Sequence, residues 1–184
     1  SLLYSISLEG KPDCSGLLSC NYYSGEGVTD FDSGLPLFLH KPDSPVHLAD
    51  FMRTHMMSAM ATLKIGMDIL RSENVKIDKI FGHGGYFKTP VAGQRILSAA
   101  IGAPVSVMET AGEGGPYGMA LLAAYMIWGK GSSLEDYLDQ KVFATSKTQT
   151  IMADEAEVKG FDQYIENYKK LLDVEKKALE AFDA

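Results

Sequence analysis

The chain has 184 residues, a formal net charge of −7 at pH 7, 46% hydrophobic residues and 22% charged residues. These proportions fit one globular domain with a sizeable core. The acidic balance argues against nucleic-acid binding, for which a basic patch is typical. The longest apolar stretch, residues 120–128, is far shorter than the ~20 residues of a membrane span. No secretory signal opens the chain, so we expect a cytoplasmic protein with no nucleic-acid or membrane partner.

The first 46 residues alternate short apolar runs, at 2–8 and 16–23, with turn-forming residues. This pattern predicts short strands and loops. Apolar residues then recur every three or four positions, which predicts a long helix over 47–71. A strand is expected over 76–81, and it leads into a glycine-rich turn at 82–85.

A proline opens the next predicted helix, over 90–101, where the first turn tolerates it well. A short strand is expected over 104–108, followed by a second glycine-rich turn at 111–115. The third helix, over 116–128, is apolar nearly all round, so we expect it to be buried.

Ser132 or Ser133 is placed to cap a helix that begins at Leu134. Residues 144–159 are polar and are expected to form a loop, and 162–182 form the last predicted helix. The alternation of helix and strand in the middle of the chain predicts α/β layering within a single domain.

Cys14 and Cys20 are the only cysteines of the chain. Their spacing differs from the Cys-x2-Cys pattern of common zinc sites. We therefore expect two reduced thiols and no metal-binding residues.

The junction at 80–90, where a strand ends, glycines turn the chain and a helix begins, predicts a nucleotide site. Glycines let the backbone approach a base or a phosphate closely, and a helix start offers free N–H groups and a positive dipole end. Two known motifs fail here. The Walker A pattern has Phe87 where it requires a glycine before Lys88. The Rossmann pattern lacks its third glycine, at Phe87 or at Tyr117.

The segment Gly84–Pro90, with Gln94 after it, resembles the adenosine-contacting motif of the FGGY carbohydrate kinases, roughly Gly-Gly-Gly-x-Lys-Ser-Pro with a later Gln. Residues 102–105 resemble the family's Gly-x-Pro-Val strand. Residues 113–124 resemble its Glu-x4-Gly-Ala-Ala-x2-Ala-Ala helix, and 161–168 resemble its tyrosine-rich closing helix. The resemblance covers about residues 47–182.

This resemblance implies an α/β, actin-like, ribonuclease H-like ATPase lobe with a mixed sheet flanked by helices. It implies transfer of the γ-phosphoryl group of ATP, with Mg²⁺, to a sugar hydroxyl, with a pentulose such as xylulose as the expected substrate. The nucleotide-binding residues that it implies are Gly84, Gly85, Tyr86, Lys88, Gln94, Glu113 and Gly114.

The chain also departs from the family pattern. No Gly-x-Gly-Asp-like segment is present that could hold the family's catalytic aspartate, and the phosphate-binding hairpin is missing. We therefore expect residues 1–184 to be the nucleotide-binding lobe alone, with the catalytic Asp and the sugar-binding N-terminal lobe upstream, and the isolated chain to be inactive. Tyr86 replaces the family's third glycine, and Ala99 or Ala100 replaces a frequent Asp.

Two other interpretations stay open. The same lobe could have lost its nucleotide and serve as a non-catalytic binding or regulatory module, which the substitution at Tyr86 motivates. The chain could instead be a divergent P-loop protein that holds phosphate through Lys88. A lobe separated from its partner leaves apolar surface in water, so we also allow for a homodimer.

Overall fold

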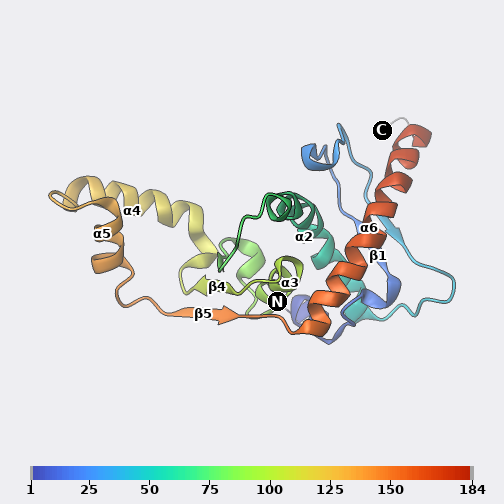
Figure 1. Cartoon of the computed structure of the whole chain (residues 1–184), viewed down its shortest axis with the longest axis horizontal. Helices are drawn as coiled ribbons and strands as arrows, with labels where there is room; N and C mark the ends of the chain where they lie inside the picture. The colour runs from blue at the N-terminus through green and yellow to red at the C-terminus, as the bar shows by residue number, and fades with distance from the viewer. Residues whose placement is uncertain (1, 183–184) are drawn as a thin grey trace.

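The structure, a computed structural model, describes residues 2–182 apart from the side chain of Glu113. The helices are α1 Leu2–Ile6, α2 Leu48–Ser72, α3 Ala92–Ile101, α4 Gly114–Trp128, α5 Leu134–Tyr137 and α6 Glu155–Phe182. The strands are β1 Leu18–Cys20, β2 Leu37–Leu39, β3 Ile80–Phe81, β4 Val105–Met108 and β5 Thr148–Ile151. Helices α2, α3 and α6 form the body of the molecule, and α4 and α5 project from it as an arm (Figure 1).

The larger sheet is mixed, as expected from the sequence. β3 and β4 pair in parallel, with Ile80 opposite Val105, and β5 pairs with β4 in antiparallel orientation, with Ile151 opposite the same Val105. Helix α3 makes the crossover between the two parallel strands. A separate antiparallel hairpin joins β1 and β2. The α/β fold class is therefore confirmed.

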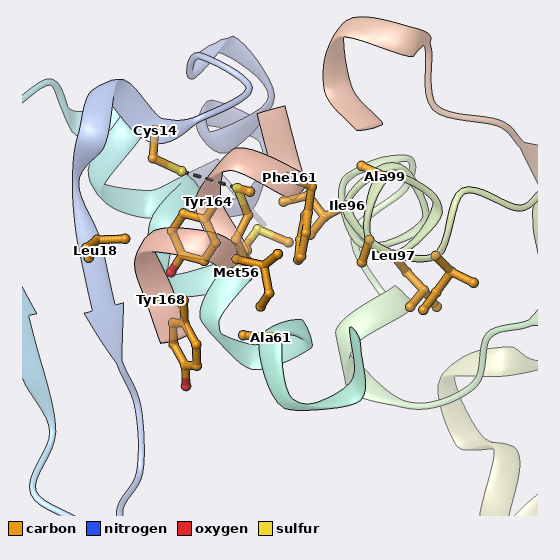
Figure 2. Packing of buried hydrophobic residues seen from close by; sticks show 14 of the residues in the cluster. Cys14, Leu18, Met56, Ala61, Ile96, Leu97, Ala99, Phe161, Tyr164 and Tyr168 are labelled. Carbon is orange, nitrogen blue, oxygen red and sulfur yellow. Dashed lines mark hydrogen bonds between the residues drawn. The ribbon is translucent and has the colours of Figure 1, made fainter. Parts of the chain in front are cut away.

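The core lies between α2, α3, α6 and β1, and Figure 2 shows part of it. Helix α6 buries Phe161, Tyr164, Tyr168 and Leu171, whose spacing of three and four residues places them on one face of the helix. Met56 and Met57 of α2 are buried in the same cluster. Cys14 and Cys20 are buried and free, which confirms the prediction of reduced thiols.

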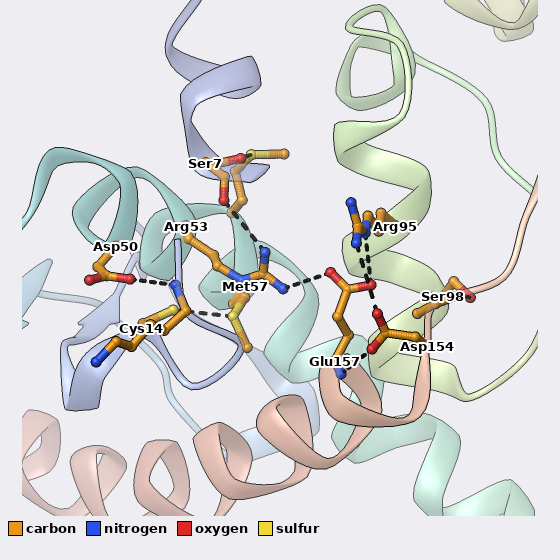
Figure 3. Close-up of polar contacts among 12 residues, drawn as sticks. Ser7, Cys14, Asp50, Arg53, Met57, Arg95, Ser98, Asp154 and Glu157 are labelled. Atoms are coloured by element: carbon orange, nitrogen blue, oxygen red, sulfur yellow. Dashed lines mark hydrogen bonds and ion pairs between the residues drawn. The ribbon is translucent and has the colours of Figure 1, made fainter. Parts of the chain in front are cut away.

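A buried ion-pair cluster joins three helices (Figure 3). Arg53 of α2 donates from Nη2 to Oε1 of Glu157, at 3.3 Å, and Arg95 of α3 donates from Nε to Oε2 of the same carboxylate, at 2.8 Å. Arg53 is only 2% exposed. A buried charge is costly unless it is paired, so this cluster fixes α6 against both α2 and α3.

The prediction that the helix after residue 116 is buried was wrong. None of the described residues of α4 is buried, and Met126 and Trp128 are 78% and 69% exposed. Helix α4 projects beyond the three-stranded sheet (Figure 1), and the α5 segment that folds back onto it covers only part of its apolar surface. Within the described residues, no helix has the length and apolar character needed to cross a membrane.

Three local predictions need correction for tertiary reasons. Residues 2–6, expected to be a strand, form α1, which lies beside α2. The expected strand at 76–81 is reduced to β3, because only Ile80 and Phe81 have partners on β4. The expected loop at 144–159 contains β5, which pairs with β4, and the first turn of α6.

Candidate nucleotide site

Two glycine-rich turns, 82–85 and 111–115, follow the parallel strands β3 and β4. The amide of Gly84 donates to the carbonyl of Ala111 at 2.7 Å, so the turns are joined directly. Gly84 has φ +97°, a conformation that favours glycine because a Cβ would clash with the backbone. A short 3-10 helix, Gly85–Phe87, then leads toward α3.

The second turn lies close to the first turn and to Lys88, so a side chain on Gly112 or Gly114 would displace a neighbour. A Cβ placed on Gly112 would lie 3.2 Å from Cε of Lys88, and one placed on Gly114 would lie 2.9 Å from Cβ of His83. The aliphatic stem of Lys88 therefore lies along Gly112. The structure thus brings Gly84, Lys88 and Gly114 together at one edge of the sheet.

The other face of these turns is open. Nothing lies within 4 Å of the position that a Cβ would take on Gly85 or on Gly115. Helix α4 begins at Gly114, so the positive end of its dipole lies beside the open backbone. Such an arrangement suits a flat base against the backbone and a phosphate near the helix start.

The side chain of Tyr86 is directed into the domain. Its hydroxyl donates to the Met56 carbonyl at 3.0 Å, and its ring packs edge-on against Tyr4 and Phe87. Burial raises the pKa of this phenol far above its usual range. A Cβ on Gly93 would lie 2.5 Å from the Tyr86 carbonyl oxygen. Any contact of Tyr86 with a ligand would therefore come from its backbone.

Gln94 is also interior. Its Nε2 donates to the carbonyls of Val105, at 3.1 Å, and of Gln149, at 3.0 Å, so it holds α3 to β4 and β5. It borders a cavity of about 350 Å³, which Pro90 and Lys147 also line. Glu113 ends a 3-10 helix, Ala111–Glu113, and its side chain lies outside the described part of the structure.

An apolar cavity of about 480 Å³ lies between the two turns and the arm. His83 and Thr110 line it from the side of the turns, Tyr117 lines it from the first turn of α4, and Leu134 and Leu138 line it from α5 and the residue after it. No sequence pattern indicated this cavity, because it exists only where the α5 segment folds back onto α4. The cavity places His83 beside the candidate site. The sequence-based prediction did not include His83 among the site residues.

The family model for the "FGGY family of carbohydrate kinases, C-terminal domain" matches residues 2–127 of the chain. The chain belongs to the FGGY family of carbohydrate kinases. This match confirms the resemblance to the family motifs at residues 84–94 and 102–124. It also rules out the alternative of a divergent P-loop protein. Kinases of this family use ATP as the phosphoryl donor.

Solved FGGY kinases share the fold. The xylulose kinase from Rhodospirillum rubrum matches with a TM-score of 0.70 and 18% identity, over 98% of this chain and 34% of that one. Gluconate kinase from Lactobacillus acidophilus matches with a TM-score of 0.70 and 14% identity, over 96% and 34% of the two chains. Plasmodium falciparum glycerol kinase, solved with ADP, matches with a TM-score of 0.69 and 15% identity, over 95% and 33%.

These matches show an actin-like ATPase lobe, as the resemblance implied. The chain spans about a third of the length of these FGGY kinases. No curated protein matches its sequence significantly. Among the side chains that the structure describes, no group of three or more His, Cys, Asp or Glu could hold a metal ion.

Proposed function

We propose that this chain is the nucleotide-binding lobe of a cytoplasmic FGGY kinase that transfers the γ-phosphoryl group of ATP to a hydroxyl of a pentulose such as xylulose. The observation that carries the proposal is the pair of joined glycine turns, with Gly85 open to solvent and Lys88 lying along Gly112. The choice of a pentulose is supported by the xylulose kinases among the structural neighbours, from Rhodospirillum rubrum and Brucella ovis for example.

In this proposal the adenosine lies against the backbone of Gly84 and Gly85, where no side chain intervenes. The Lys88 ammonium and the first N–H groups of α4, at Gly114, face the phosphates and offset their charge. Tyr86 and Gln94 support the site from beneath by fixing the turn to α2 and the sheet. Phosphoryl transfer depends mainly on positioning and charge neutralisation, and this lobe would supply the positioning of the nucleotide.

Mg²⁺ would arrive with the ATP phosphates and neutralise part of their charge. We assign no protein ligand to this ion, because the described residues contain no group of three or more His, Cys, Asp or Glu that could hold it.

The catalytic aspartate and most sugar contacts would come from the remaining part of a longer kinase. Helix α4 supports this division of roles, because it leaves the large apolar side chains of Met119, Met126 and Trp128 in water. Exposed apolar patches of this kind mark interaction surfaces. We propose that a second lobe of the same kinase covers α4, and that the isolated chain self-associates through it.

The test is ADP release by the complete kinase with MgATP and a panel of ketoses, polyols and aldoses. We expect turnover with one pentulose and none with the isolated chain. Turnover on a different sugar class would correct the substrate. ATP binding without turnover on any sugar would replace the kinase by a non-catalytic nucleotide-binding module.

A further inference from the structure

Val91 has a backbone conformation that its side chain disfavours. Its φ is +70° and its ψ is −50°, and the amide of Ala92 donates to the carbonyl of Pro90 at 2.8 Å. These values describe a γ-turn of the rare, strained kind with a positive φ at its centre. A β-branched residue at positive φ is a genuine outlier, whereas glycine adopts the same φ readily.

Contacts on both sides of Val91 favour its strained conformation. On one side, Tyr86 is anchored to Met56 of α2. On the other, Gly93 lies directly beneath the Tyr86 carbonyl oxygen, and Gln94 is bonded to two strands. The backbone therefore leaves the turn at Tyr86 and comes back beneath the carbonyl oxygen of Tyr86 at Gly93, only a few residues later. A sharp reversal at Pro90–Ala92 is what permits this, and it also leaves Lys88 along Gly112.

Strained residues persist only where their surroundings over-determine them, and they cluster at ligand clamps and switches. We propose that Val91 is a strained hinge of the nucleotide turn, which holds nucleotide affinity below the value that an unstrained turn of the same shape would give. The proposal rests on the proposed nucleotide-binding function. It names Val91 as a positioning residue, since its side chain need not touch the ligand.

Relaxation of Val91 to a negative φ would move residues 88–90 and disturb the alignment of Lys88 with the open glycines. Only the strained form is then competent to bind, and the apparent affinity falls with the fraction of that form. The cost of holding an ordinary residue in a sparsely populated φ/ψ region sets the size of the effect at roughly tenfold. The same strain would favour release of ADP, a step that often limits turnover.

The experiment measures ADP binding to the chain by calorimetry, and the ADP dissociation rate by stopped flow. Val91→Gly should bind ADP up to about tenfold more tightly and release it correspondingly more slowly. Val91→Ala keeps an L-residue at positive φ and should stay within about twofold of the parent chain. Val91→Asn replaces the β-branched side chain by a residue type that is enriched at positive φ, so it should lie between them and serves as a second variant if the glycine variant fails to fold.

Asp30→Gly is the matched control, because Asp30 is an exposed residue at φ +60° in a different loop. Relief of strain there should leave the affinity for ADP unchanged. Equal or weaker ADP binding by both Val91→Gly and Val91→Asn, with the parent chain still binding, overturns this inference alone. Absence of ADP binding in every variant and in the parent chain overturns the proposed function together with it.

Discussion

Gly84 and Ala111 are joined by a 2.7 Å hydrogen bond from the amide of the first to the carbonyl of the second. Each residue lies in the turn that follows one of two neighbouring parallel strands, β3 and β4. Ligands of open α/β sheets bind beyond the carboxyl ends of such strands. The two glycine turns are therefore one structural unit, and a ligand that approaches Gly85 also approaches the start of α4.

Gln94 should prove important for stability rather than for nucleotide affinity. Gln94→Leu removes both bonds from Nε2 to the carbonyls of Val105 and Gln149, and it should lower the free energy of unfolding by about 1–3 kcal/mol. Urea unfolding measures this, with Gln163→Leu, at an exposed position of α6, as the control. A loss of ADP affinity in a Gln94→Leu chain of unchanged stability would contradict this role.

Gly93 should tolerate no side chain. A Cβ there would lie 2.5 Å from a backbone oxygen, that of Tyr86, so Gly93→Ala should destabilise the chain by roughly 1–3 kcal/mol through overpacking. Gly118→Ala in α4 has open space around its Cβ and should be neutral or stabilising, because alanine favours helices. Thermal unfolding of the two variants distinguishes them, and equal melting temperatures would show that Tyr86 is not held as described.

The apolar face of α4 should govern self-association. Met119 and Met126 are 70% and 78% exposed, so replacing both by Lys should change the free energy of unfolding by less than about 0.5 kcal/mol. Sedimentation velocity should show weaker concentration-dependent association. Phe182→Lys removes an equally exposed apolar side chain at the end of α6 and should leave association unchanged. Association that persists in the α4 variant would move the interface elsewhere.

Glu175 should make stability depend on pH. Its side chain is fully buried, its Oε1 accepts from the Leu35 amide at 2.6 Å, and its Oε2 has no partner among the described residues. Burial raises the pKa of this carboxyl, and the Leu35 bond only partly opposes the rise. The folded chain then binds the proton more tightly than the unfolded chain. Its stabilising contribution is therefore present at acid pH and is lost as the pH rises through the raised pKa.

The matching experiment compares the free energy of unfolding of the parent chain and of Glu175→Gln from acid to neutral pH. The stability of the parent relative to the variant should fall as the pH rises above the ordinary carboxyl range. Parallel pH profiles for the two chains would show that Glu175 titrates normally in the folded state.

Sequence periodicity located the elements whose faces pack within this chain. The helix expected over 47–71 is α2, Leu48–Ser72, and the strand expected over 104–108 is β4, Val105–Met108. Ser133 caps α5 by accepting from the Asp136 amide, as its position predicted. Elements defined by distant partners were missed: β5 depends on pairing with β4, and the exposure of α4 depends on how far it extends beyond the sheet.

The site was predictable to the extent that glycine spacing and family motifs reveal it. Those signals identified Gly84, which has a positive φ, and Gly114, where a Cβ would meet His83, together with Gly85, whose surroundings are open. They could not reveal that Tyr86 points inward, because that depends on a bond to Met56 thirty residues away. They also placed the start of α3 at Pro90, whereas the γ-turn at Val91 delays it to Ala92. The ligand contacts of the seven nucleotide-binding residues that the family resemblance implied remain predictions.

The central claim is that the open backbone at Gly85 receives the nucleotide, and calorimetric titration of Gly85→Trp with ADP tests it most directly. A Cβ at Gly85 meets nothing within 4 Å, so the variant should fold with the stability of the parent chain. Gly27→Trp, at an exposed glycine with equally open surroundings, is the control. We predict saturable ADP binding by the parent chain and by Gly27→Trp, and a loss of at least about tenfold in Gly85→Trp. Unchanged ADP affinity in Gly85→Trp would contradict the assignment of these turns as the nucleotide site.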